Sequence, residues 1–305
     1  MGALPGKRLV TLAFPVLLPF FTDRLHGCAN AVTGRCITRD LMEKIMNKDS
    51  VLERFRLDGR IALVTGASSG LGRHFAKLLA TVGAEVLVAA RRADKLGELV
   101  AEIETAGGKA HALSLCVTDS ASVIACYDQA AEVAGVPDII VNNAGVTVTK
   151  PLLEQSEEDW DSVLDTNLKG GWLVATEGAR RMVAAGKGGC IVNVASILGE
   201  RVAGGVAPYA ISKAGVIQAT KAMALELARY DIRANALLPG YIATELNREF
   251  LASASGEKLR SRIPRRRFGE LTDLDGPLLL LASEAGRHLS GTCLAVDGGH
   301  LVSSL

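Results

Sequence analysis

From Arg60 onward, short apolar runs alternate with longer stretches whose hydrophobic residues recur at helical spacing. The apolar runs predict strands over residues 61–66, 85–91, 109–115, 138–145, 189–196, 232–240 and 291–299. The other stretches predict helices over 74–83 and 94–108, from Ser156 toward Ala185, and over 208–229. Strands separated by helices require crossover connections. The pattern therefore predicts an α/β fold, a single doubly wound parallel sheet of the Rossmann type with helices on both faces.

The first fifty-five residues do not follow this alternation. Lys7 and Arg8 precede an apolar run over 9–21, which is too short to span a bilayer and is interrupted by Pro15 and Pro19. This arrangement is typical of a signal-peptide core followed by small residues, or of a transit peptide. Either would make the segment a targeting signal.

Two other interpretations of the same segment remain open. Cys28 lies in a weak lipoprotein-box pattern, which would tether the chain to a membrane, and translation could instead begin at Met42 or Met46. Export would separate a nicotinamide-dependent enzyme from its reduced cofactor, so we favour a disordered leader or a mis-assigned start over 1–55. No Ser- or Pro-rich linker divides residues 56–305, which we predict to form one domain.

Composition narrows the function classes. The 305 residues are 49% hydrophobic, and the net charge of +1 gives no general attraction for nucleic acid or anionic membrane. The six cysteines include no C-x-x-C and the five histidines no H-E-x-x-H, so no metal site is predicted. We expect reduced thiols in a cytoplasmic protein, with no nucleic-acid partner and no stable membrane contact.

A glycine-rich loop, "TGASSGLG" (65–72), joins the first predicted strand to the first helix. Gly66 would allow a sharp turn, Gly70 the approach of a pyrophosphate, and Gly72 close contact between helix and strand. Such a loop could be only a turn. At the end of the first strand, however, backbone amides and a helix N-terminus favour a dinucleotide phosphate.

Together the motifs resemble those of the short-chain dehydrogenase/reductase (SDR) family over roughly residues 56–300. "TGASSGLG" is similar to the family's cofactor loop, "NNAG" (142–145) to its sheet-stabilising motif, and "PGYIAT" (239–244) to its nicotinamide-side loop. The resemblance implies an oxidoreductase that interconverts a carbonyl and a secondary alcohol. It implies a catalytic tetrad of Asn167, Ser196, Tyr209 and Lys213. The cofactor-binding residues would be Gly66, Ser68, Ser69, Gly70, Leu71, Gly72, Arg91, Arg92, Val117, Asn143, Ala144, Gly145, Tyr209, Lys213, Pro239, Gly240, Ile242 and Thr244.

The tetrad residues suit this chemistry. Hydride transfer to a carbonyl leaves an oxygen that must receive a proton, and a tyrosine pKa of about 10 is too high for a good base near neutrality. Lys213, four residues after Tyr209 on one helix face, would lower that pKa by its charge. Ser196 would orient the carbonyl, and by resemblance Asn167 would hold a water in a proton relay. The plainer alternatives are an ordinary helix-surface pair, a strand-end cap and a helix-kink residue.

The cofactor choice depends on the end of the second strand, where "VAARR" has no acidic residue to accept bonds from an NAD ribose. Arg91 and Arg92 suit the 2′-phosphate of NADP(H), which we favour over NAD(H). The alternative is two solvated arginines. One departure from the family pattern is Cys116, where an aspartate usually lies near the adenine, although Val117 can still contribute its backbone.

The substrate is less well defined. By resemblance, residues 241–268 would form a substrate lid, and the basic run "RIPRRR" (262–267) is either a solvated face or a surface that steers an acidic carrier. The resemblance implies a small carbonyl or alcohol, with 3-oxoacyl thioester reductases and NAD-dependent sugar-acid or polyol dehydrogenases as two classes. It also implies a homotetramer or homodimer formed by helices near 157–185 and 208–229. The alternative to an enzyme is a non-catalytic protein that binds a nicotinamide cofactor and acts as a sensor or scaffold.

Overall fold

Seven parallel strands form one sheet in the computed structural model, which describes residues 51–245 and 247–303. The strands are β1 (Ile61–Thr65), β2 (Glu85–Ala90), β3 (Lys109–Ser114), β4 (Ile139–Asn142), β5 (Gly189–Val194), β6 (Ile232–Pro239) and β7 (Cys293–Val296). Their order is β3-β2-β1-β4-β5-β6-β7, so the direction of winding reverses between β1 and β4. The predicted doubly wound parallel sheet is confirmed. The predictions for residues 1–50 lie outside the described residues.

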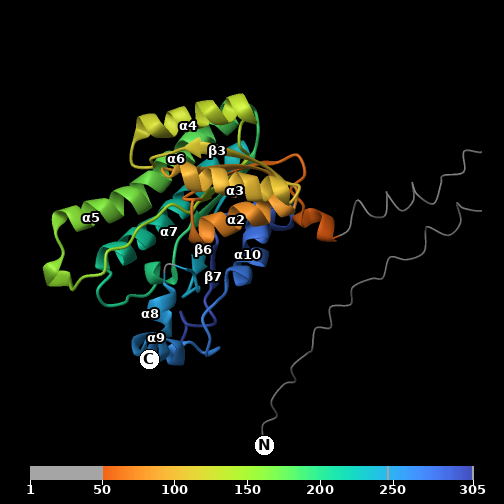
Figure 1. Ribbon diagram of the computed structural model, residues 1–305. Coiled ribbons are helices and arrows are strands. Elements are labelled where there is room, and N and C mark those ends of the chain that lie inside the picture. The colour runs from red at the N-terminus through yellow and green to blue at the C-terminus, as the bar shows by residue number, and fades with distance from the viewer. Residues whose placement is uncertain (1–50, 246, 304–305) are drawn as a thin grey trace, which may run out of the picture. The chain divides into compact units, whose positions relative to one another are not determined.

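Helices cover both faces of the sheet (Figure 1). One face carries α2 (Gly70–Thr81), α3 (Ala93–Thr105) and α10 (Asp275–Ala282). The other carries α4 (Ser120–Val133), α6 (Gly171–Ala184) and α7 (Ala207–Leu227). Outside these layers lie α5 (Glu157–Leu164), which leads toward α6, and the short α8 (Arg248–Ala252) and α9 (Ala254–Arg262) in the region after β6. No helix of the described residues is long and apolar enough to cross a membrane.

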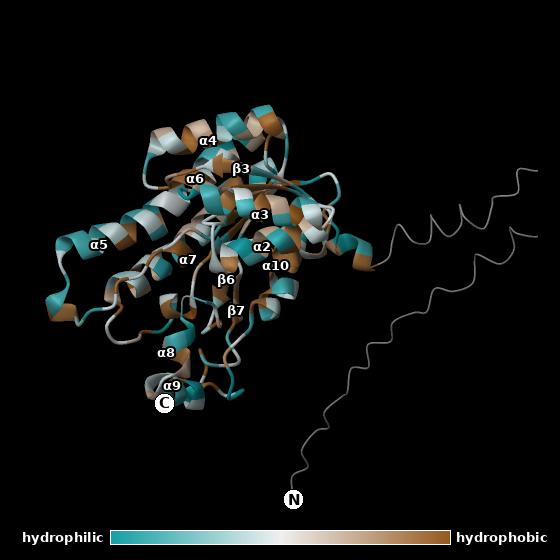
Figure 2. Ribbon diagram, in the orientation of Figure 1, coloured by the Kyte–Doolittle hydropathy of each residue, from teal (hydrophilic) through white to brown (hydrophobic). Residues whose placement is uncertain are grey.

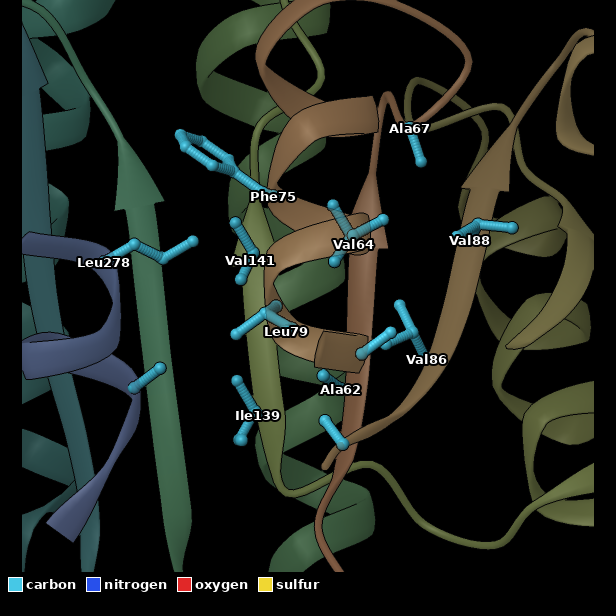
Figure 3. Packing of buried hydrophobic residues seen from close by; sticks show 14 of the residues in the cluster. Ala62, Val64, Ala67, Phe75, Leu79, Val86, Val88, Ile139, Val141 and Leu278 are labelled. Atoms are coloured by element: carbon cyan, nitrogen blue, oxygen red, sulfur yellow. The ribbon is translucent and has the colours of Figure 1, made fainter. Parts of the chain in front are cut away.

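The alternation of side chains along each strand divides the core between the two faces. In β1, Ala62 and Val64 pack toward α2 while Leu63 packs toward α4 and α6, and all three are fully buried. Figure 3 shows Phe75 and Leu79 of α2 lying over these strand residues. Colouring by hydropathy shows the same division, with apolar strands inside and mixed helices outside (Figure 2). Strands buried on both faces explain the nearly continuous apolar runs in the sequence.

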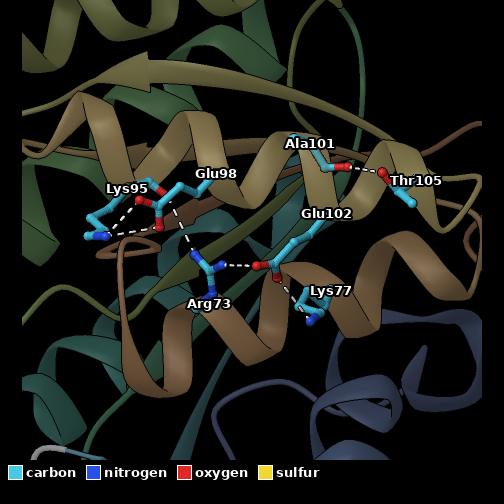
Figure 4. A network of polar contacts seen from close by, with 7 residues as sticks. All are labelled: Arg73, Lys77, Lys95, Glu98, Ala101, Glu102 and Thr105. Atoms are coloured by element: carbon cyan, nitrogen blue, oxygen red, sulfur yellow. Dashed lines mark hydrogen bonds and ion pairs between the residues drawn. The ribbon is translucent and has the colours of Figure 1, made fainter.

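The outward faces of α2 and α3 are joined by ion pairs instead (Figure 4). Glu102 accepts from Arg73 at 2.5 Å and from Lys77 at 3.2 Å, and Lys95 pairs with Glu98 at 2.7 Å. Apart from the less exposed Arg73, these side chains are about half exposed, and surface pairs of this kind each contribute about 0–1 kcal/mol. The apolar inner faces therefore supply most of the stability of this layer.

The predicted strands are slightly too long, and one difference affects the site. β4 ends at Asn142, so the rest of the "NNAG" motif forms a loop beyond the carboxyl edge of the sheet. The helix α4 was not predicted from the sequence, because its many alanines and serines give only a weak amphipathic pattern. The start at Ser156 is confirmed, since its hydroxyl accepts from the Asp159 amide and the Asp159 carboxylate accepts from the Ser156 amide.

Candidate active site

The glycine loop makes the close contacts predicted from its spacing. Gly66 has a φ of +66°, and a Cβ built on it would lie 2.8 Å from the Cα of Ala144. A Cβ on Gly72 would lie 2.5 Å from the carbonyl oxygen of Gly66. Neither position has room for a side chain, so the two glycines allow β1 to turn directly into α2.

The N-terminus of α2 is free to bind an anion. The helix begins at Gly70, and among the described residues the Ser69 side chain forms no capping hydrogen bond with it. Apart from its chain neighbours and its own helix, a Cβ built on Gly70 would meet no described atom within 4 Å, so the backbone is open at this point. The first amides of a helix lack partners within it and carry its positive dipole end, which favours a phosphate.

A network of hydrogen bonds joins the glycine loop to the "NNAG" segment. The Thr65 hydroxyl accepts from the backbone amides of Asn143 and Ala144 at 3.0 and 3.1 Å. In return the Asn143 side chain donates to the Thr65 carbonyl at 3.0 Å. Thr65 was not predicted as a site residue, although a hydroxyl at the last position of the first strand was the available signal.

The two arginines after β2 have different surroundings. The Arg92 guanidinium donates to the hydroxyls of Ser68 and Ser69, at 2.8 and 2.9 Å from Nη2. Arg91 is exposed, and among the described residues it forms no ion pair. Both line a cavity of about 360 Å³ at the carboxyl edge of the sheet, at the reversal point of the strand order.

Most predicted cofactor residues line this cavity: Gly66, Ser68, Ser69, Gly70, Leu71, Arg91, Arg92, Val117, Asn143, Ala144, Gly145 and Thr244. Pro239, Gly240 and Ile242 do not line it, because Pro239 ends β6, the Gly240 amide donates to Val296, and Ile242 packs in the core. The cavity also contains residues that were not predicted to bind the cofactor, namely Ala89, Ala90, Leu115, Cys116, Thr118, Val146 and Thr166. Several of these follow strand ends, which was the available signal.

Cys116 occupies the position at which the SDR resemblance implied an aspartate. Its Sγ lies 3.2 Å from the Thr118 hydroxyl, and this hydrogen bond lowers the pKa of the Cys116 thiol, with a smaller contribution from the charge of Arg91. The wall of the cavity therefore has a thiol and a hydroxyl here instead of a carboxylate.

Tyr209 and Lys213 do meet on one face of α7. The Lys213 Nζ lies 5.5 Å from the centroid of the Tyr209 ring and donates to the Val194 carbonyl at 2.7 Å. Lys213 is only 5% exposed, and burial lowers its pKa to about 8. The ammonium still predominates at neutral pH.

The direction of the Tyr209 shift differs from the expectation from sequence. Burial raises the pKa of Tyr209, and a hydrogen bond with Ser196 opposes that rise only in part. The charge of Lys213 does not offset this rise, and its Nζ donates to the Val194 carbonyl. Ser196 is also a cap, since its hydroxyl accepts from the Leu198 amide at 3.1 Å.

Asn167 lies in a π-helical turn, Asp165–Gly170, between α5 and α6. Its side chain forms a two-way pair with the backbone of Val146, accepting at 2.7 Å and donating at 2.9 Å. A Cβ on Gly145 would lie 3.2 Å from the Asn167 Oδ1 and 3.7 Å from the Lys213 Nζ. Gly145 lines the 360 Å³ cavity, so Asn167 and Lys213 lie directly behind that part of its wall.

Comparison with known proteins supports these observations. A family model described as enoyl-(acyl carrier protein) reductase matches residues 66–300. The chain is 39% identical over 250 residues to gluconate 5-dehydrogenase of Gluconobacter oxydans, which covers 82% of this chain and 97% of that relative. It is 38% identical over 247 residues to a 3-oxoacyl-[acyl-carrier-protein] reductase of Thermotoga maritima, with 81% and 100% covered.

A solved structure of similar fold is a gluconate 5-dehydrogenase from Burkholderia cenocepacia in complex with NADP and tartrate. Its TM-score is 0.80 at 38% identity, with 83% of this chain and 99% of that chain covered. The chain belongs to the short-chain dehydrogenase/reductase family, as its motifs indicated. It is an oxidoreductase of the type that acts on CH–OH groups.

Proposed function

We propose that the protein is an NADP(H)-dependent oxidoreductase that interconverts a small carbonyl compound and a secondary alcohol. The observation that carries this proposal is that Tyr209 and Lys213 meet on α7, with Lys213 directly behind Gly145, in the wall of a cavity that also contains the open helix end of the glycine loop. Such a combination of perturbed titratable groups and a concave site is typical of an active site.

The residues present fit a dinucleotide. Gly66 and Gly72 leave no room for side chains, Gly70 is open, and the α2 N-terminus would hold the pyrophosphate. Asn143, Ala144 and Gly145 would lie along the nicotinamide half of the molecule. When bound, the nicotinamide supplies or accepts the hydride.

Tyr209 would donate a proton to the carbonyl oxygen during reduction and take it back during oxidation. Its raised pKa keeps the phenol protonated near neutrality, the state required for donation. Ser196 lies close enough to Tyr209 to offset in part the rise that burial causes in its pKa, so one carbonyl oxygen could contact both hydroxyls. Lys213 would stabilise the phenolate left behind, and Asn167 would stabilise the water relay that restores the proton.

The arginines at the end of β2 support NADP(H) over NAD(H). Arg91 is exposed on the cavity wall without a carboxylate partner among the described residues, and β2 ends in alanine where a ribose-binding acid would lie. Arg92 is held by Ser68 and Ser69, so both would flank an adenosine 2′-phosphate. The NADP complex of the Burkholderia relative supports the same choice. We place the protein in the cytoplasm, where NADPH is available.

We further propose that copies of the chain associate through α6 and α7 as a homodimer or homotetramer. A groove of about 610 Å³ runs between these helices, and its lining includes Ala179, Ala222 and Trp172. Trp172, Val183 and Tyr230 line this groove and are each 38–48% exposed, and a contiguous apolar surface of this kind is typical of an interface. Sedimentation of the full chain would show the assembly.

The test of function is turnover. The purified chain should oxidise NADPH in the presence of at least one ketone or oxo acid from a broad panel, and more slowly with NADH. Tyr209→Phe should retain cofactor binding and lose turnover. Cofactor binding with no turnover of any panel member would overturn the proposal in favour of a binding protein.

A further inference from the structure

A second group of polar side chains lies at the carboxyl edge of the sheet, on the side of Tyr209 that faces β6 and β7. Arg201 follows the 3-10 turn Ile197–Gly199 after β5, Tyr241 follows β6, and His300 follows β7. Because the strands are parallel neighbours, their carboxyl ends meet at one edge, so these residues converge there. None of the three belongs to the tetrad or to the cofactor cavity.

Direct contacts hold the group together. The rings of Tyr241 and His300 lie with centroids 5.7 Å apart at a tilt of 38°. The Arg201 guanidinium donates to the His300 carbonyl and approaches the Ser303 hydroxyl at 3.5 Å. Ser196 follows β5 and Tyr241 follows β6, its neighbour in the sheet, so the group lies at the same edge as Ser196.

The group has an unmatched positive charge. Among residues 51–245 and 247–303, Arg201 forms no ion pair. Burial lowers the pKa of His300, and the positive charges of Arg201 and Arg262 both act on the ring and help to lower it. The nearby acid is Asp297, whose oxygens accept from the amides of Gly299 and Leu301 at 2.8 and 2.5 Å. Asp297 therefore directs its oxygens at backbone amides and forms no ion pair with Arg201.

His300 also has an unused polar atom. The side chain is 5% exposed, and within the described part of the chain its Nδ1 has no hydrogen-bond partner. A buried polar atom without a partner costs about 1–3 kcal/mol, so such atoms in native sites commonly pair with a ligand or water. The Nδ1 is itself buried, so it helps to fix the ring behind Tyr241, whereas Arg201 is bonded, among the described residues, only to a neutral carbonyl and a neutral hydroxyl and points to a ligand with acceptor oxygens.

We propose, building on the proposed function, that Arg201 and Tyr241, with His300 packed against the Tyr241 ring, bind the carboxylate of a small oxo or hydroxy acid and so direct its carbonyl toward Tyr209. The carboxylate would accept from the guanidinium and the phenol, since charge-assisted bonds of this kind are the strongest available at a partly buried surface. A neutral polyol or ketone would leave Arg201 desolvated without a counter-charge, which disfavours it. The enzyme would thus select acids over their neutral analogues.

The experiment measures binding by calorimetry, so it does not depend on turnover. The probes are gluconate and glucitol, which differ at one end in having a carboxylate or a hydroxymethyl group, and they are titrated into the full-length chain saturated with NADP+. The wild type should bind gluconate roughly 10- to 100-fold more tightly than glucitol. In Arg201→Gln this ratio should fall to near one, and in Arg201→Lys it should stay well above that of the Gln variant.

Two further variants separate recognition from folding. Tyr241→Phe removes a hydroxyl without touching the bonds of Arg201 to the C-terminal segment, and it should lower the ratio by roughly threefold to tenfold. Arg229→Gln, at the opposite edge of the sheet and stacked on Tyr230, is the matched control and should leave the ratio unchanged. A structural role alone for Arg201 would weaken both probes equally.

Equal binding of the two probes by the wild type, or an unchanged ratio in Arg201→Gln, would overturn the carboxylate subsite. The turnover panel tests the proposed function separately. Selective gluconate binding in a chain that reduces no carbonyl would sustain the subsite and refute the catalytic proposal. Reduction of neutral ketones with no carboxylate preference would do the reverse.

Discussion

The two halves of the carboxyl edge are built in different ways. Around β1, β2 and β4 the cofactor half is shaped by backbone, with Gly66 and Gly72 in close contact and Thr65 joined to Asn143. The half beyond β5 is shaped by buried polar side chains, above all Lys213 and Tyr209. Close backbone packing stabilises the fold, whereas a buried ammonium opposes it. Changes in the first half should therefore affect stability or cofactor affinity, and changes in the second should affect the rate.

The largest expected effect is on the rate. Tyr209→Phe removes the proton donor while keeping the ring, so kcat should fall by about 10³-fold, within the usual range for general acid–base groups. The Kd for NADPH and the unfolding midpoint in urea should change little. Steady-state kinetics and urea titration check both. If Tyr209→Phe lost as much free energy of unfolding as it lost in activation free energy, the proposed difference between the two halves would be wrong.

The next largest effect tests the cost of the buried ammonium. Burial lowers the pKa of Lys213 from 10.5 to about 8, so between these values the unfolded chain binds a proton that the native chain does not. The free energy of unfolding of the wild type should therefore rise with pH, relative to Lys213→Met, by roughly 3 kcal/mol across that interval. Below about pH 8 the native state carries the full cost of burying the charge.

Urea titrations of both proteins at several pH values measure this difference. Lys213→Met should also lose most of its turnover, while Lys169→Met, which removes an exposed lysine, should show no such pH dependence. If the difference in free energy of unfolding between the wild type and Lys213→Met does not change with pH, the ammonium is well solvated or paired in the native state. The second half of the edge would then not be destabilising.

The same contrast explains what could be predicted from the sequence. The glycine loop and Asn143 were predictable because close backbone approach requires glycine, and a loop after the first strand has one place in a parallel sheet. The group of Arg201, Tyr241 and His300 was not predicted, because it joins single side chains from three separate connections. No local spacing marks such a group.

The fold was predictable for a related reason, with two gaps among the helices that cover the sheet. Strands buried on both faces leave continuous apolar runs, whereas α4 has a weak amphipathic pattern and α10 is apolar almost throughout, and both were missed. The direction of the Tyr209 pKa shift was also wrong, because the sequence shows that Lys213 is a neighbour but not that both groups are desolvated. Burial is a property of the folded molecule.

A smaller effect, on stability, should come from the glycine loop. In Gly72→Ala the new Cβ would lie 2.4 Å from the Asn143 Nδ2 and 2.5 Å from the Gly66 oxygen, so we expect a loss of about 1–3 kcal/mol and weaker NADPH binding. Gly97→Ala is the matched control, because its Cβ meets no atom within 4 Å in the middle of α3. That variant should be more stable by about 0.5–1 kcal/mol. Thermal melts of the two would have opposite shifts; shifts of the same sign would show that the loop is not tightly packed.

The smallest expected effect is confined to cofactor choice. Arg91 is exposed on the cavity wall and contributes no ion pair within the described residues, so Arg91→Ala should leave stability unchanged. If its guanidinium contacts the 2′-phosphate, the KM for NADPH should rise about tenfold while the KM for NADH stays constant, because only NADPH carries that charge. Arg92→Ala should raise the same KM and also loosen the glycine loop, since Arg92 donates to Ser68 and Ser69. Equal changes for NADPH and NADH in Arg91→Ala would show that this arginine is a solvated surface residue, and the preference for NADPH would then rest on Arg92 alone.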